Sequence, residues 1–159
     1  MAISRHATLA ASLVTHLGAS WSDKPAGLSV VRAYDYDHLI KDLSDDSESI
    51  VAVITPRIGT ETSSRRTDRD TVPVFVVLLA SLADATLASV DPWDLLAESM
   101  RDSLRSRTLA AVDLGGGVTA RRVDSVEMPT PYDADYIDAS NLFLSVAECE
   151  YTISIDVED

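Results

Sequence analysis

Apolar and polar positions near the start of the chain predict an amphipathic helix followed by a strand. Apolar residues recur every four positions, as expected for one face of a helix over residues 4–17. Ser4 is placed to cap its start, and Gly18 to end it in the left-handed conformation. Residues 28–34 then have the composition of a strand. The apolar face of the helix consists of Leu9, Leu13 and Leu17.

Two further segments are apolar on both alternating faces. Residues 50–54 read Ile-Val-Ala-Val-Ile, and residues 72–82 carry Val, Phe and Leu at both parities. Such strands are covered on both sides, by the core on one side and by another element on the other. A structureless loop as long as the polar segment between them is unusual in a compact domain. We therefore predict a hairpin over residues 50–83 with an exposed arm formed by residues 55–71.

A second helix is predicted over residues 92–107 from its capping signals and its periodicity. Asp91 is placed as the N-cap and Pro92 as the first helical residue. One face of the predicted helix is apolar and suited to packing in the core. The residues of that face are Trp93, Leu96, Ala97, Met100 and Leu104.

The rest of the chain predicts two closing strands, over residues 118–128 and 142–155. The second alternates apolar and polar residues, as does a strand with one face in the core and one in water. Three consecutive glycines, 115–117, indicate a flexible turn before the first of them. We assign all these elements to a single domain that spans residues 1–159.

The charge balance excludes some classes of function. Twenty-six Asp and Glu residues oppose thirteen Lys and Arg residues, so the net charge is −13. A surface this acidic repels a nucleic-acid backbone and argues against a general DNA-binding protein. No apolar run is long enough to span a membrane, so no membrane association is expected.

Residues with catalytic or metal-binding chemistry do not gather into a recognisable motif. The histidines stand apart, and His6 and His16 are interpreted as ordinary residues of the first helix. Asp35, Asp37 and His38 offer ligands for a divalent cation, but the acidic stretch 35–48 is interpreted mainly as a solvated connection. The single Cys149 is expected to be a small core residue. We expect no enzyme activity, no metal and no cofactor.

The predicted arm holds the only local concentration of positive charge. One interpretation is a solvated loop tip whose charge nearby acids balance. The other is a docking arm that adds strand pairing and arginine–carboxylate contacts to an acidic neighbouring copy. The candidate interface residues are Arg57, Thr60, Thr62, Arg65, Arg66 and Arg69.

Four segments, taken in their order along the chain, resemble the tail-terminator and tail-completion (neck) proteins of tailed bacteriophages and related viruses, typified by the lambda tail terminator. They are Ile50–Arg66 with Ser64-Arg65 before the second hairpin strand, Asp91–Glu98, Val126–Asp133 and Asn141–Val146. The likeness covers nearly the whole chain. The acidic stretch 35–48 departs from the family pattern because it is longer and more acidic.

The resemblance implies an α+β fold, with an antiparallel (mixed) sheet of about four to five strands, two helices packed on one face and a long protruding hairpin arm. It also implies a virion structural protein, assembled in the host cytoplasm, that forms a homo-oligomeric, hexameric ring. Such a ring caps the tail tube protein and joins it to the head-completion (connector) protein, while DNA passes through the lumen without specific binding. The next subunit of the ring would cover the second apolar face of the hairpin strands.

Two alternatives remain at this point. An acidic DNA mimic or regulator would occupy the basic groove of a DNA-binding protein, although the arginine-bearing arm argues against this role. A small metal-dependent enzyme using Asp35, Asp37 and His38 has the least support, because the sequence lacks a second ligand cluster.

Overall fold

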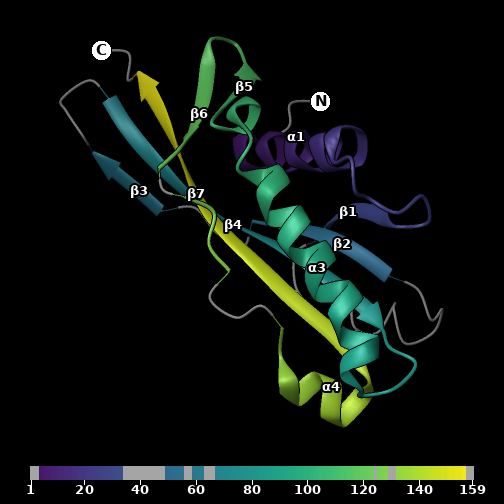
Figure 1. Ribbon diagram of the computed structural model, residues 1–159. Coiled ribbons are helices and arrows are strands. Elements are labelled where there is room, and N and C mark those ends of the chain that lie inside the picture. The colour runs from purple at the N-terminus through teal and green to yellow at the C-terminus, as the bar shows by residue number, and fades with distance from the viewer. Residues whose placement is uncertain are drawn as a thin grey trace.

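The chain forms an α+β fold built on one mixed sheet, as the computed structural model shows (Figure 1). The structure describes residues 4–33, 49–55, 59–62, 67–123, 125–128 and 132–156, without the side chains of 59–62, 67–69 and 155–156. The elements in chain order are α1 (Arg5–Ser20), β1 (Ser29–Ala33), β2 (Ser49–Ile54), β3 (Gly59–Thr62), β4 (Thr67–Ser81), α3 (Leu87–Leu104), the 3-10 helix η1 (Arg107–Leu109), β5 (Ala111–Gly115), β6 (Val118–Arg122), α4 (Ala134–Ser140) and β7 (Leu142–Asp156).

The sheet has more strands than the four or five expected. Within the described ranges, six strands follow the order β1-β2-β4-β7-β6-β5, and β3 pairs with β4 outside this path. β1 and β2 are parallel, whereas the other pairs are antiparallel. The additional strands are β3, which lies in the segment assigned to the arm, and β5, which the sequence did not distinguish from the region after the second helix.

The two longest strands, β4 and β7, pair along their full length. The register runs from Thr67 opposite Asp156 to Ser81 opposite Leu142. β2 and β3 share the other edge of β4, with β2 opposite residues 75–80 and β3 opposite residues 68–71. The predicted hairpin is therefore confirmed in its β2–β4 part. Its outer part continues as a sheet extension formed by β3, β4 and β7, and β6 pairs with residues 151–153 of β7 at its base. Figure 1 shows this extension, at the upper left, leading away from α3 and α4.

Both α1 and α3 pack on one face of the sheet. The leucines predicted on the first helix, Leu9, Leu13 and Leu17, are fully buried there. They join side chains of α3 and of the central strands, including Val51 and Phe143, in one hydrophobic cluster. Burying this apolar surface is the main source of stability for both helices, because an isolated helix of this length is marginal in water.

The opposite face of the hairpin strands is also apolar, and its central part is buried within the single chain. Ala52, Val77 and Leu79 have no exposed surface and form a second cluster with Ile54 and Leu142. The prediction that both faces of these strands are covered is confirmed for their central part. These positions offer no free surface to a neighbouring subunit. The ring hypothesis expected the next subunit to cover the whole second face, and the structure leaves only part of that face exposed.

Helix α1 is longer than its pattern predicted. It begins directly after Ser4, as expected, but the Ser4 side chain makes no capping hydrogen bond. Gly18 lies inside the helix, which ends at Ser20, so the prediction that Gly18 terminates it is wrong. The buried side chain of Trp21, next to the helix end, extends the apolar face of α1 by one further position.

Helix α3 begins one turn earlier than predicted. Its N-cap is Thr86, so Asp91 and Pro92 lie inside the helix and are not its cap and first residue. The carboxylate of Asp84 fixes the start, since it accepts hydrogen bonds from the Thr86 amide at 3.1 Å and the Ser89 hydroxyl at 2.6 Å. An aspartate before a proline is a strong local signal, but this earlier turn overrides it. The proline is tolerated at the cost of one backbone hydrogen bond.

The glycine triplet joins β5 to β6 in a hairpin. Gly115, Gly116 and Gly117 all have positive φ angles, of 85°, 61° and 79°, which glycine adopts without strain. The predicted turn is confirmed, but the strand that follows is shorter than residues 118–128. β6 ends at Arg122. Beyond it, in the described part of that segment, the Val123 amide donates to the Glu150 carbonyl and an isolated bridge joins Glu127 to Glu148.

Candidate functional site

The predicted interface residues of the arm are only partly described. The backbones of Thr60 and Thr62 lie in β3, and that of Arg69 lies in β4 opposite Glu61. Arg57, Arg65 and Arg66 lie outside the described residues, as do Asp35, Asp37 and His38 of the candidate metal site. The role of the arm and the metal hypothesis therefore both stay predictions.

The predicted core face of the second helix is confirmed. Met100 and Leu104 are buried, and Trp93 and Leu96 are half-buried against the same cluster. Asp91 and Pro92 are exposed on the opposite side of the helix. The face that points away from the sheet is therefore polar at most positions and open to solvent.

The outermost exposed part of the second sheet face holds a small acidic hollow. Its volume is about 210 Å³, and Pro73 and Phe75 of β4 supply its apolar side chains. Three carboxylates, those of Glu127, Glu148 and Glu150, line the same hollow. This part of β4 and β7 lies beyond the buried second cluster and retains partly exposed apolar side chains.

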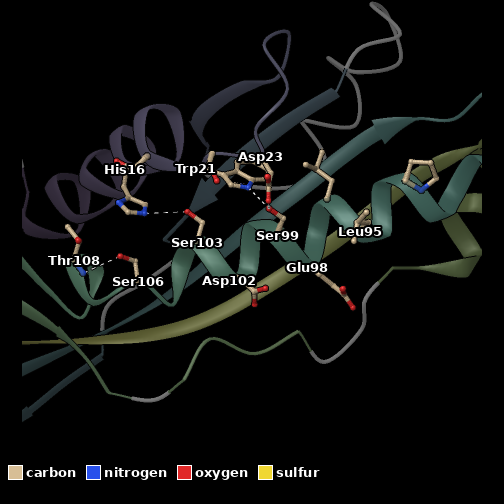
Figure 2. Close-up of a pocket in the computed structure, with 14 residues that line it drawn as sticks. His16, Trp21, Asp23, Leu95, Glu98, Ser99, Asp102, Ser103, Ser106 and Thr108 are labelled. Atoms are coloured by element: carbon tan, nitrogen blue, oxygen red, sulfur yellow. Dashed lines mark hydrogen bonds between the residues drawn. The ribbon is translucent and has the colours of Figure 1, made fainter.

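A larger groove lies between the end of α1 and the outer side of α3, and we call it the α1–α3 groove (Figure 2). Its volume is about 800 Å³. One wall comes from the end of α1 and the turn after it, and the other comes from α3 and the segment that follows. The lining residues are His16, Ser20, Trp21, Ser22, Asp23, Pro92, Leu95, Leu96, Glu98, Ser99, Asp102, Ser103, Ser106 and Thr108.

Side-chain hydrogen bonds tie the two walls of the α1–α3 groove together. The indole N–H of Trp21 donates to the Ser99 hydroxyl at 2.9 Å, and that hydroxyl donates to Asp23 at 2.7 Å. His16 Nε2 lies 3.4 Å from the hydroxyl oxygen of Ser103 (Figure 2). These contacts between the two walls hold the groove in one shape. Sequence reasoning missed the groove because it depends on where α1 ends against α3.

Two aspartates, one within α3 and one just before it, have pKa values shifted in opposite directions. Partial burial, followed by repulsion from Glu98 and Asp91, raises the pKa of Asp94. Hydrogen bonds from Ser89 and Thr86 lower the pKa of Asp84 at the start of the same helix. Asp91, Asp94 and Glu98 on α3 therefore repel one another, whereas Asp84 takes no part in this repulsion.

We expect the Asp94→Asn variant to raise Tm by about 1–2 °C at pH 7. Because the pKa of Asp94 is higher in the folded state than in the unfolded state, the folded state binds more protons. Stability is therefore lost as the pH rises through this pKa window, and the asparagine variant avoids that loss. The gain should vanish near pH 3, below both values. Thermal unfolding followed by circular dichroism measures it, with Asp138→Asn at an exposed position of α4 as control. A gain that is the same at both pH values contradicts a titration of Asp94 as its cause.

Cys149 is a buried core residue, as predicted. Burial raises the pKa of its thiol to about 12, although Arg122 opposes this shift. The thiolate needed for nucleophilic or metal-binding chemistry is therefore scarce near neutral pH.

A metal site and a membrane span each place requirements on the described residues. His6 and His16 both lie on α1, and the described residues contain no group of three or more potential metal ligands. None of the helices in the described segments combines the length and the apolarity that a membrane span requires.

Comparison with known proteins does not assign the chain to a family. No family model matches it, and neither does any curated protein.

Proposed function

We propose that this protein is a ring-forming structural component of a virus tail or neck, either a tail terminator or a tail-completion protein. Its ring caps the tail tube and joins it to the head connector. The observation that carries the proposal is the sheet extension formed by β3, the outer half of β4 and the end of β7. This extension leads away from α3 and α4 (Figure 1), and Arg65 and Arg66 lie between β3 and β4 in the sequence.

The surface of the extension supports contact with another copy of the chain. Pro73 and Phe75 are only half-buried, on the face opposite to α1 and α3. Carboxylates of Glu127, Glu148 and Glu150 surround them. A neighbouring arm that presents arginines meets both complementary charge and apolar surface here. The proposed contact surface is therefore the outer part of the second face of the sheet and not the whole of that face.

Native mass spectrometry and electron microscopy of the purified chain, alone and mixed with a candidate tail tube protein, test the proposal. We expect rings, either free or bound to tube ends, and tubes whose growth is halted. Replacing Arg65 and Arg66 with serine should abolish ring formation, whereas Arg107→Ser, at an exposed site on η1, should not. A chain that stays monomeric at high concentration and leaves tube length unchanged contradicts the proposed function.

A further inference from the structure

We propose that the α1–α3 groove binds a positively charged segment of a partner protein that also carries apolar side chains. This inference does not rest on ring formation. It concerns the face of the molecule covered by helices, whereas the proposed ring contact uses the opposite face of the sheet.

The apolar part of the groove is open to a ligand. Leu95 projects from α3 with 69% of its surface exposed. Leu96, Pro92 and Trp21 line the groove around it. An exposed leucine beside a preformed hollow is typical of a surface that becomes buried on binding.

The charge of the groove determines which sign of charge its ligand must carry. Asp23, Glu98 and Asp102 line it, and among the described residues that line it there is no lysine or arginine. Figure 2 shows Glu98 and Asp102 projecting from α3 on the side away from α1, so these two carboxylates form the outer rim. Arg101 and Arg105 both contact Asp102, at 3.6 and 3.8 Å, and partly neutralise it. Glu98, one turn along α3 from Asp94, is therefore the principal carboxylate for a cationic ligand.

The length of the groove favours a peptide segment over a small molecule. The lining residues extend along α3 from Pro92 to the segment just after the helix, which corresponds to about 20 Å of helix. A helix of similar length lies along such a groove with its apolar side chains against the floor and its charges at the rim. The hydrogen bonds between the walls mean that the groove need not rearrange to accept it.

Binding of a designed probe tests this assignment on the full-length chain. The probe is a fluorescently labelled amphipathic peptide of ~14 residues built from leucine and lysine, long enough to match the groove. Its counterpart has glutamate in place of lysine. Fluorescence anisotropy measured at low and physiological salt gives the dissociation constants. We expect the lysine peptide to bind and the glutamate peptide not to bind.

Matched variants separate binding in the groove from attraction to a protein of high negative charge. The double variant Leu95→Ala/Glu98→Gln should weaken binding of the lysine peptide by about tenfold. The control Leu87→Ala/Asp138→Asn removes an equally exposed leucine and an exposed carboxylate outside the groove, and should weaken binding by less than about twofold. All four side chains lie outside the core, so circular dichroism should show both variants folded. Equal weakening by the two variants, no binding of the lysine peptide, or equal binding of the glutamate peptide each overturns the proposal.

Discussion

Replacing Trp21 with alanine is expected to lower the free energy of unfolding by about 3–5 kcal/mol. Only 5% of the Trp21 surface is exposed, and its indole fills the space where α1 ends against the core. Alanine leaves a cavity there and also removes the hydrogen bond to Ser99. Urea unfolding followed by circular dichroism measures the loss.

The Trp21→Phe variant separates these two contributions. Phenylalanine keeps an aromatic ring in the core but has no N–H to donate, so we expect a cost of about 1–2 kcal/mol. Ser99 still donates to Asp23 in this variant and is not left without a partner. If phenylalanine costs as much as alanine, the hydrogen bond dominates, and packing of the ring is not the main contribution of Trp21 to stability.

Arg122→Met is expected to lower the free energy of unfolding by about 2–3 kcal/mol. Arg122 comes from β6, yet its guanidinium caps the end of α3. One nitrogen donates to the Leu104 carbonyl at 2.6 Å and the other to the Arg105 carbonyl at 3.3 Å. These bonds satisfy two carbonyls at the negative end of the helix, and methionine keeps the stem of the side chain but loses both bonds.

A neighbouring residue provides the control for this prediction. Arg121→Met removes the same charge from an exposed position on the same strand, and should change the stability by no more than about 0.5 kcal/mol. Chemical denaturation of both variants, at low and high salt, distinguishes a local cap from a general effect of net charge. Similar losses in the two variants contradict a capping role for Arg122.

The sequence predicted the elements in which the spacing of apolar residues follows directly from burial of one face. The alternation along β7 placed Phe143, Tyr151 and Ile153 on the core side, and all three are buried there. The core face of α3 was found in the same way. Periodicity works for such elements because every turn or every second residue meets the same environment.

Two kinds of feature could not be predicted: a helix start for which two local caps compete, and contacts between segments that are distant in the sequence. The start of α3 is set by Asp84, which lies before the Asp-Pro pair that resembles a cap. The cap at its other end comes from Arg122 on a different element. The α1–α3 groove likewise depends on the contact between Trp21 and Ser99, which are far apart in the sequence. The basic arm stays a prediction, since Arg57, Arg65 and Arg66 lie outside the described residues.

The position of β7 also has a consequence for how the protein folds. β7 follows all the other strands in the sequence, yet it lies between β4 and β6 at the centre of the sheet. During translation, the nascent chain exposes the core edge of β4 until β7 leaves the ribosome. Sheet closure thus depends on sequence-distant pairing, which predicts slow refolding and exposes an aggregation-prone edge in the meantime.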